Sequence, residues 1–430
     1  MFSLVAAPCG CPSGDKKRFA ACVDCRRRFG PPQGITQALT NSQFSHALRI
    51  VMLAPFGIRP KGTLLARMLP LAQALTRRGH SVAIIAPPVQ NPEDAGTRVV
   101  YNGVPVIHTA LPHLTDPFTT FTHSAAMLRR ALAERPTLLH LFKPKGYSGL
   151  AALAARIVRP RLPLVVDTDD WEGAGGWNTL RSYPASAKAL FAWQERDLPR
   201  RAHAVTVASR TLESLVWSLG VAPQRVIYLP NGATLPKLRL ITPTTPTLLL
   251  YTRFWELDLA ELSTALAAIH TARPKARLIV VGHGENDEEH TLRALAARAG
   301  FAPMLDYRGW LAPAAIPATL AAAQVALVPA RDTLINRARC SAKLLELMGA
   351  GLAVLASDVG EARTFIQSEH SGLLVPPGDP GAFAAAVLRL LDDQPLRERL
   401  GAEARVAAAR FSWDALAPLA EDAYRVALGG

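Results

Sequence analysis

Three cations and one carboxylate lie close together in the stretch RARCSAKLLE, and such side chains bind phosphates and sugar hydroxyls. The pattern predicts a helix that begins after Ser341, a frequent N-cap residue, and that leads into a buried strand, LAVLAS. Lys343 and Glu346 share one face of this helix, and Lys343 stands in the first turn, where the helix dipole disfavours a cation. With Arg337 and Arg339 just upstream, these residues predict a phosphate site. A surface helix with a chance ion pair is the alternative.

A turn rich in glycine and proline, PFGIRPKGT, follows the first apolar run of the chain. Gly57 and Gly62 would let the backbone approach a ligand, and Lys61 lies where a helix should begin. The turn matches neither the dinucleotide-binding nor the Walker A pattern. It indicates a phosphate contact, with an ordinary turn as the alternative.

Four acidic residues, Asp167, Asp169, Asp170 and Glu172, stand within six positions in the turn DTDDWEG. This turn closes a predicted strand, and the ligands of open α/β sheets gather at such strand ends. The carboxylates could hold a divalent metal, orient sugar hydroxyls or act as a base. The alternative is that they only balance the basic surroundings of this half of the chain.

A second group of candidates ends the first two predicted strands of the second half. Arg253 follows TLLLYT, and a cation at the carboxyl edge of a sheet usually requires an anion. Gly282 and Gly284, in VVGHGE, permit close approach of the backbone. These positions predict an anion site at the edge of a second sheet.

The elements that must position these residues are short apolar runs that alternate with helical periods from Leu48 onward. This alternation predicts parallel sheets with helices on both faces, and its two series predict two Rossmann-like α/β domains, which the family resemblance described below places on either side of a cleft. The Pro-rich stretch PKLRLITPTTP between the series reads as a linker. The expected parts are a Cys-containing basic extension (1–45), an N-terminal domain (46–235), the linker (236–246), a C-terminal domain (247–410) and a C-terminal helix (411–430).

The positive charge of the chain is confined to its first half. Residues 1–235 hold 28 Lys and Arg against 13 Asp and Glu, whereas residues 236–430 hold 20 against 21. This asymmetry favours an anionic partner for the first half, such as a membrane leaflet or a phosphorylated acceptor. Nucleic acid is disfavoured, because few aromatic residues are interleaved with the basic ones and no nucleic-acid motif is found.

The sequence contains neither an apolar run of the roughly eighteen residues that a spanning helix needs nor a signal-peptide pattern at its start. We therefore expect a cytoplasmic protein that can associate peripherally with the inner face of the membrane. Pairs of basic residues on or beside predicted helices would carry this association: Arg77 and Arg78, Arg129 and Arg130, Lys143 and Lys145, and Arg200 and Arg201.

Four of the five cysteines stand in the extension, with the spacing C-x-C-x10-C-x2-C. Four thiolates could close a tetrahedral zinc site, whose binding energy would fold a segment that has few large apolar residues. The alternatives are an unstructured basic tail and a stretch added by a mistaken start codon. The candidate zinc ligands are Cys9, Cys11, Cys22 and Cys25.

Residues 48 to 428 resemble the retaining glycosyltransferases of family 4, which have the GT-B fold. The blocks that carry the resemblance include LAQALTRRGHSVAIIA, RLIVVGHGE, KLLELMGAGLAVLASDVGEA and SGLLVPPGDPGAFAAAVLRLLDD, in the order of the family. The resemblance implies that the N-terminal domain binds the acceptor and the C-terminal domain the nucleotide sugar. It does not specify the donor or the acceptor.

Matched by position, Gly57 and Gly62 resemble the glycine loop that meets the phosphates of the donor. Arg253 resembles the arginine that binds the pyrophosphate, and Glu346 resembles the second acid of an E-x7-E motif, which binds the nucleotide ribose. The expected donor-binding residues are Gly57, Lys61, Gly62, Gly282, Gly284, Arg339 and Glu346, and the expected catalytic residues are Arg253, Lys343, Asp169 and Asp170.

The chain departs from the family pattern at three places. Asp258 stands where the family usually has a lysine, and Ala338 stands in place of the first acid of E-x7-E. Asp169 and Asp170 replace a His-Asp pair, and we expect Asp169 to contact the transferred sugar. We expect Lys343, with its neighbouring arginines, to supply the missing positive charge.

The resemblance implies a transferase that moves a sugar from a nucleotide-diphosphate sugar to a hydroxyl of a glycan or lipid-linked acceptor, with retention of configuration. It implies no metal cofactor for catalysis, so zinc in the extension would be structural. The alternatives are a catalytically inactive scaffold or sensor that binds nucleotide sugars, and a related epimerase.

Overall fold

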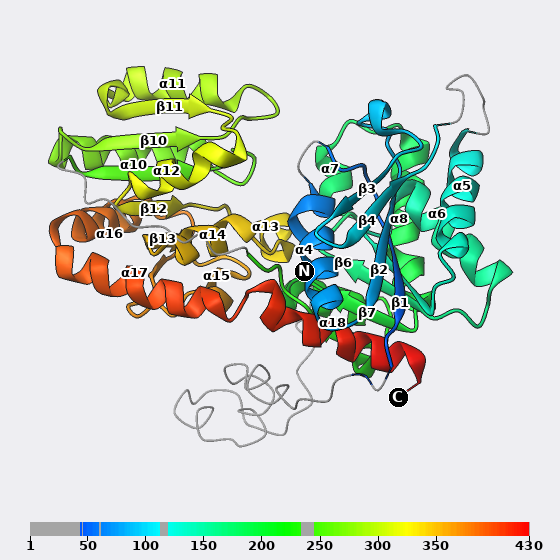
Figure 1. Cartoon of the computed structure of the whole chain (residues 1–430). Helices are drawn as coiled ribbons and strands as arrows, with labels where there is room; N and C mark the ends of the chain where they lie inside the picture. Colours follow the sequence, from blue (N-terminus) through cyan, green and yellow to red (C-terminus); the bar gives the residue numbers. More distant parts are fainter. Residues whose placement is uncertain (1–43, 45, 60–61, 112–118, 234–244, 430) are drawn as a thin grey trace, which may run out of the picture. The chain divides into compact units, whose positions relative to one another are not determined.

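The computed structural model describes residues 44, 46–59, 62–111, 119–233 and 245–429. The four cysteines of the extension and most of the expected linker lie outside these residues, so the zinc site remains a prediction. Residues from Phe44 onward form one unit, which contains two β-sheets, each with its own helices (Figure 1).

The first sheet has eight strands in the order β3-β4-β2-β1-β5-β6-β7-β8, all parallel except β3. Its strands are β1 (Arg49–Leu53), β2 (Ser81–Ala86), β3 (Arg98–Tyr101), β4 (Val104–His108), β5 (Leu138–Phe142), β6 (Leu164–Thr168), β7 (Ala204–Val207) and β8 (Val226–Tyr228). The central strands are buried over nearly their whole length, which explains why they read as apolar runs. The carboxyl ends of β1, β5 and β6 therefore lie side by side at one edge.

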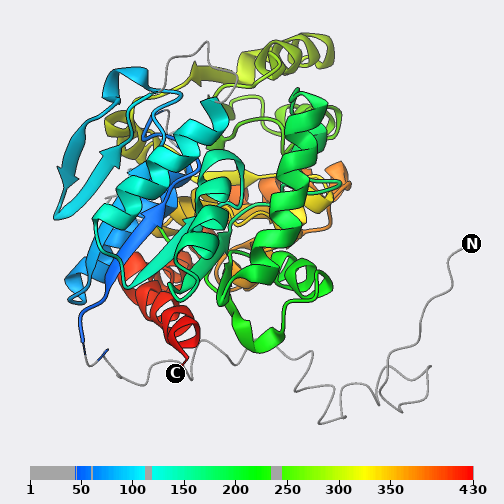
Figure 2. The ribbon, with the colours of Figure 1, turned by 90° about the vertical axis from the view of Figure 1, so that its right-hand side faces the viewer.

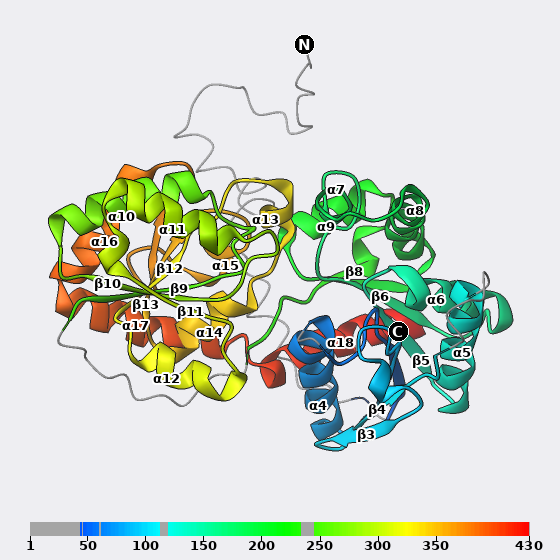
Figure 3. The ribbon, with the colours of Figure 1, turned by 90° about the horizontal axis from the view of Figure 1, so that it is seen from above.

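Helices cover this sheet in two groups: α5, α6 and α8 pack together, and α4 packs with the last helix of the chain, α18 (Trp413–Leu428; Figure 3). A short π-helix, η1 (Leu64–Met68), leads into α4. The helices of this domain are α4 (Leu69–Arg77), α5 (Thr119–Ala133), α6 (Gly146–Val158), α7 (Trp177–Leu180), α8 (Ala185–Arg201) and α9 (Arg210–Ser218), with single 3-10 turns at η2 (Pro92–Asp94) and η3 (Pro223–Arg225).

The antiparallel hairpin of β3 and β4 and the helix α5 are additions to the expected series of strands and helices. The hairpin turns at Asn102 and Gly103, which have φ angles of 48° and 86°. Two consecutive residues with positive φ are typical of the tight turn that joins two antiparallel strands. The Asn-Gly pair is therefore the sequence signal for this hairpin.

The second sheet has six parallel strands in the order β11-β10-β9-β12-β13-β14. Its strands are β9 (Thr247–Tyr251), β10 (Arg277–Val281), β11 (Leu305–Gly309), β12 (Val325–Val328), β13 (Ala353–Ser357) and β14 (Leu373–Val375). The helices are α10 (Leu259–Ala272), α11 (Glu288–Ala299), α12 (Ile316–Ala321), α13 (Leu334–Ala338), α14 (Ala342–Ala350), α15 (Ala362–Phe365), α16 (Pro380–Asp392) and α17 (Gln394–Ala409), with 3-10 turns at η4 (Ala302–Met304) and η5 (Pro313–Ala315). Two parallel-sheet α/β domains are thus present, as the sequence predicts.

The helix predicted after Ser341 is α14. The Ser341 hydroxyl accepts a hydrogen bond from the backbone N–H of Leu344 at 3.4 Å, which is the expected N-cap contact. Gly351 ends the helix with a φ of 82°, and β13 follows directly. The local pattern therefore holds the first turn of α14 beside the carboxyl end of the second sheet.

The last helix, α18 (Trp413–Leu428), follows the second domain in sequence but packs on the first (Figure 2, red). It contacts α4, β7 and β8. Its buried Glu421 accepts hydrogen bonds from the Arg78 guanidinium at 2.6 and 2.9 Å. Its buried Tyr424 hydroxyl lies 3.0 Å from His140 Nδ1 in the middle of the first sheet.

Candidate active site

A cavity of about 500 Å³ is lined by residues that follow the carboxyl ends of strands in both sheets. Such strand ends are where open α/β sheets bind their ligands. Most of the site residues expected from the sequence lie in its wall: Gly62, Asp169, Asp170, Arg253, Gly282, Arg339, Lys343 and Glu346.

Three of the expected residues are not placed in this wall. Gly57 packs against another loop, because a Cβ built there would lie 1.7 Å from Asn91 Oδ1. The N–H of Gly284 donates to Glu289 Oε2 at 3.0 Å, so this glycine serves the start of α11. Lys61 lies outside the described residues. Of the three residues of that turn expected to contact phosphate, only Gly62 is placed in the cavity wall.

The second domain contributes a wall in which Lys343 is crowded by other cations. Lys343 stands in the first turn of α14, and its ammonium lies 4.5 Å from the centre of the Tyr251 ring. The pKa of Lys343 is lowered to about 8, mainly by burial and then by Arg253 and Arg339, whereas Glu256 opposes this shift. An anion in the cavity would relieve this crowding and restore the charged form of the lysine.

Arg339 is held by the buried carboxylate of Glu256, at 3.6 Å, and its guanidinium lies 4.9 Å from the centre of the Trp255 ring. Burial would raise the pKa of Glu256, but Arg339 and Lys343 outweigh burial and lower this pKa. Glu256 was not predicted from the sequence, although it stands three residues after Arg253. It acts as the counter-charge that keeps the cation cluster in place.

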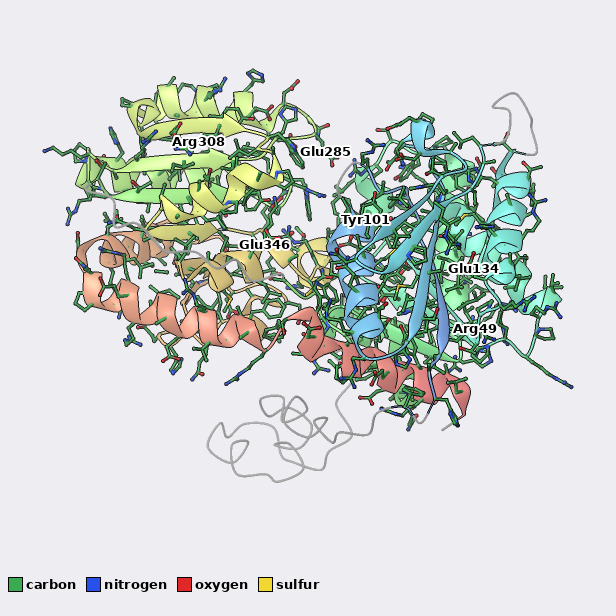
Figure 4. The ribbon with its side chains drawn as sticks, viewed as in Figure 1. Arg49, Tyr101, Glu134, Glu285, Arg308 and Glu346 are labelled. Atoms are coloured by element: carbon green, nitrogen blue, oxygen red, sulfur yellow. The ribbon has the colours of Figure 1, made fainter. Side chains whose placement is uncertain are left out.

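Arg253 completes this wall, and its side chain has no ion pair with any residue in the part of the chain that the structure describes. Glu346, labelled in Figure 4, comes from the same helix as Lys343. Three cations therefore face two carboxylates, Glu256 and Glu346, in this wall. We call these five residues the donor-side wall. Arg337 is not part of it, because it is exposed and paired with Asp332.

The first domain contributes a wall of opposite character. Lys143 and Lys145 follow β5, and Asp169, Asp170 and Glu172 follow β6. We call these five residues the acceptor-side wall. Lys143 Nζ lies 2.5 Å from Asp170 Oδ2 and 3.5 Å from Asp169 Oδ1, and Lys145 Nζ lies 2.7 Å from Glu172 Oε2. The acidic turn predicted from the sequence is thus bound to two buried lysines.

One carboxylate oxygen of Asp169 in this wall is buried without a hydrogen bond. Its Oδ2 accepts a hydrogen bond from the Thr63 hydroxyl at 3.2 Å, whereas its Oδ1 is buried without one. The pKa of Asp169 is raised to about 6, mainly by burial and also by Asp170, whereas Lys143 opposes this shift. Burial would lower the pKa of Lys143, but the three carboxylates outweigh it and raise this pKa. Asp169 is therefore mainly ionised at neutral pH and able to accept a hydrogen bond from a ligand.

A buried ion pair between Arg67 and Asp167 lies next to the acceptor-side wall. Arg67, in the π-helix η1, donates to both oxygens of Asp167 at 2.8 and 2.6 Å, and both side chains are almost fully buried. The same guanidinium donates to Asn231 Oδ1 at 2.9 Å. Arg67 therefore links the end of β6, next to the acidic turn, and the loop after β8 to the π-helix η1.

Two tryptophans connect the walls. The rings of Trp177, from α7, and Trp255, which follows β9, lie 4.5 Å apart in an edge-to-face arrangement. Nearby, Arg181 forms an ion pair with Glu285, which is labelled in Figure 4. Both tryptophans line the cavity. They give the ligand an aromatic surface at the junction of the two walls.

Polar atoms of the cavity wall lack partners that proteins normally provide. Four buried atoms of lining residues have no hydrogen bond to any described residue: Asp169 Oδ1, Trp177 Nε1, Trp255 Nε1 and Glu256 Oε2. An unsatisfied buried polar atom costs free energy, about 1–3 kcal/mol, unless a ligand or water completes it. These four atoms are therefore available for hydrogen bonds to a polar ligand or to water.

The family lysine and acid that this chain lacks have been replaced by structural residues. Asp258 is the N-cap of α10 and accepts hydrogen bonds from the N–H groups of Ala260 and Glu261 at 2.9 and 3.1 Å. Ala338 is buried in α13. Neither residue lines the cavity. Asp258 thus has a role of its own that a lysine could not perform.

Sequence reasoning missed several residues of the cavity or assigned them elsewhere. Lys143 and Lys145 were taken as surface cations, yet they follow a buried strand directly, which was the available signal. Trp177, Trp255 and Glu256 gave no signal, because none of them belongs to a motif that the sequence displays.

Two families match consecutive parts of the chain. The family described as "Glycosyl transferase 4-like domain" matches residues 62–232, and that described as "Glycosyl transferases group 1" matches residues 245–393. Together they cover most of both sheets and both walls of the cavity. The fold is the GT-B fold, and the chain belongs to the GT4-type glycosyltransferases.

Individual relatives agree with this assignment. The chain is 27% identical to the phosphatidyl-myo-inositol mannosyltransferase of Mycobacterium leprae over 86% of its own length and 94% of that protein. Its fold is similar to sucrose-phosphate synthase from Thermosynechococcus elongatus, with a TM-score of 0.69, 20% identity and coverage of 88% and 98% of the two chains. It is also similar to Anabaena HepE in complex with UDP-glucose, with a TM-score of 0.64, 18% identity and coverage of 88% and 98%.

Proposed function

We propose that this glycosyltransferase takes its sugar from a nucleotide-diphosphate donor and transfers it, with retention of configuration, to a hydroxyl of a glycan or lipid-linked acceptor. The observation that carries the donor assignment is the donor-side wall. There Arg253 has no ion pair with the described residues, and Lys343 has a pKa of about 8 because burial and neighbouring cations disfavour its charge. A diphosphate carries the negative charge that would balance the cations of this wall. The HepE structure with UDP-glucose supports the assignment by its likeness.

In this proposal, the bond between the anomeric carbon and the diphosphate oxygen breaks, and its electron pair leaves with the diphosphate. Arg253, Lys343 and the N-terminus of α14 stabilise the negative charge as it grows on that oxygen. The acceptor hydroxyl oxygen forms the new bond on the same face of the sugar, and its proton passes to the leaving diphosphate. The protein's own cations supply the compensating charge, so we expect transfer to continue in EDTA.

The acceptor is assigned more coarsely. The mycobacterial relative is named for transfer to phosphatidyl-myo-inositol, which is a lipid that carries a polyol ring. The acceptor-side wall offers carboxylates, and Trp177 and Trp255 beside it add indole N–H groups and aromatic faces, and these groups suit a hydroxylated ring. We therefore infer an acceptor that presents such a ring to the cavity.

Peripheral binding to an anionic membrane remains part of the proposal, but the surface expected to mediate it needs correction. Lys143 and Lys145 are buried in ion pairs and cannot meet a membrane. Arg77 and Arg78 pair with Asp414 and Glu421 of α18. Exposed arginines remain at positions 77, 129, 200 and 201, although Arg201, like Arg77, is paired with a carboxylate, that of Asp197. No described helix is long and apolar enough to cross a membrane.

A binding protein without transferase activity is the second candidate, favoured by the missing lysine at Asp258 and the missing acid at Ala338. Isothermal titration with UDP, GDP and ADP identifies the nucleotide, and incubation with the matching radiolabelled nucleotide sugars measures release of the sugar. We expect binding of one nucleoside diphosphate and slow donor hydrolysis without acceptor. Binding of a diphosphate without any turnover, with and without an acceptor, would favour the second candidate.

A further inference from the structure

The charges around the cavity are unequally divided between its two halves. The first domain lines it with four cations, Arg67, Lys143, Lys145 and Arg181, and each already has a carboxylate partner. By contrast, Arg253 of the donor-side wall has no ion pair among the described residues. Within the described part of the chain, every cation with which the first domain lines the cavity is therefore already paired, and none is available to a phosphate.

The lysines of the acceptor-side wall are the clearest case. Lys143 faces Asp170, Asp169 and Glu172 at 2.5, 3.5 and 3.7 Å. Lys145 is held by Glu172, and its ammonium also lies 4.6 and 4.8 Å from the centres of the Tyr183 and Phe191 rings. Both ammonium groups have a full set of partners. A phosphate could reach either one only by displacing a buried carboxylate.

The wall as a whole has an excess of negative charge, with three carboxylates for two ammonium groups. A phosphate placed in this half would lie against Asp169 or Asp170 in a poorly solvated cavity, where like charges repel strongly. A hydroxyl has the opposite fit. It can donate to Asp169 Oδ1, which accepts no hydrogen bond and has only the ion-pair contact with Lys143 at 3.5 Å, and it can accept from Trp177 Nε1, which has no hydrogen bond to a described residue.

We propose that the acceptor-side wall selects a neutral polyhydroxylated ring and rejects a ring that carries its own phosphate monoester. Asp169 accepts a hydrogen bond from a ring hydroxyl, and Asp170 and Glu172 act as specificity residues because they neutralise the two lysines. This inference rests on the proposed function, since it names the acceptor class of the same cavity.

The test measures binding of matched neutral and phosphorylated rings by titration in the presence of saturating nucleoside diphosphate. The pairs are myo-inositol and its 1-phosphate, mannose and mannose 6-phosphate, and glucose and glucose 6-phosphate. For the wild-type protein we expect at least one neutral ring to bind, about tenfold or more tightly than its phosphate. Equal or tighter binding of the phosphate in every pair, or no binding of any neutral ring, would overturn the proposal.

Substitutions then assign the selectivity to the wall. Asp170→Asn removes the closest partner of Lys143, so the preference for the neutral ring should fall several-fold as the phosphate gains affinity. Glu172→Gln should do the same through Lys145, and it replaces the first variant if that one fails to fold. Asp332→Asn is the matched control, because Asp332 pairs with the exposed Arg337 outside the cavity. An unchanged preference in folded variants of both wall residues would refute their role.

Failure of this inference can be told apart from failure of the donor proposal. The diphosphate is titrated first and alone, and its affinity depends on the donor-side wall. If it binds and the neutral rings do not, the acceptor inference is wrong while the donor assignment stands. If it does not bind, the donor assignment is wrong.

Discussion

Lys343 should make binding of the diphosphate depend on pH near 8. Its ordinary pKa of 10.5 is lowered to about 8 in the free protein, by burial first and by Arg253 and Arg339 next. Only the ammonium form attracts a diphosphate, and a bound diphosphate in turn raises the pKa. Affinity is therefore complete below about pH 7 and falls as pH rises through 8.

The size of this effect follows from the fraction of Lys343 that remains protonated. With a pKa of about 8, roughly nine-tenths is charged at pH 7, half at pH 8 and one-tenth at pH 9. If only the charged form binds, the apparent Kd rises about twofold by pH 8 and about tenfold by pH 9. Isothermal titration with the preferred nucleoside diphosphate between pH 6.5 and 9.5 measures this profile directly.

A matched pair of variants separates charge from shape at this position. Lys343→Arg keeps the charge at every pH in the range, so the inflection near pH 8 should disappear while affinity at pH 7 is largely kept. Lys343→Met should bind weakly at all pH values, and its profile should also be flat. An affinity of the wild-type protein that stays constant to pH 9.5, or an inflection that persists in the Met variant, would refute the assignment.

Three further outcomes are expected. Arg253→Ala and Glu346→Ala should each lower transfer by about 10²- to 10³-fold with little change in melting temperature, because both side chains face the cavity; near wild-type turnover would contradict their roles. Asp258→Lys should lower the free energy of unfolding by about 1 kcal/mol through loss of the α10 N-cap, measured by urea denaturation, and should not strengthen diphosphate binding. Burial raises the pKa of Glu195, so the folded wild-type protein keeps a proton there that the unfolded chain loses above about pH 4.5, and wild-type stability falls as pH rises. Glu195→Gln has no such proton to lose, so its free energy of unfolding should exceed that of the wild type by an amount that grows with pH. A difference in free energy of unfolding that does not change with pH would exclude this origin.

Much of the fold could be predicted because the central strands are buried on both faces and so appear as apolar runs in the sequence. The β3–β4 hairpin was missed because its strands are short and β3 is mostly exposed, although Asn102 and Gly103 carried the turn signal. The hairpin adds an antiparallel edge to the sheet, and it lies away from the cavity. Its omission therefore did not affect the predicted site.

Some of the residues that line the cavity could also be predicted from their positions relative to the buried strands and the helices. Arg253, Lys343 and Asp169 were found because charged residues directly after a buried strand, or in a first helical turn, are seldom structural. Which cations remain available to a ligand could not be read from the sequence. Lys143 was counted as surface charge, and only its distances to three carboxylates show that it is fully committed.

The placement of α18 has a consequence for how the protein is made. The first domain needs this helix to cover His140 and to give Arg78 its carboxylate partner, yet the helix follows the whole second sheet in the chain. During synthesis on the ribosome, the apolar surface of the first domain that α18 covers therefore stays exposed until the second domain has been synthesised. We expect nascent chains of this protein to be held by chaperones longer than the length of the first domain alone would suggest, and the first domain expressed by itself to be prone to aggregation.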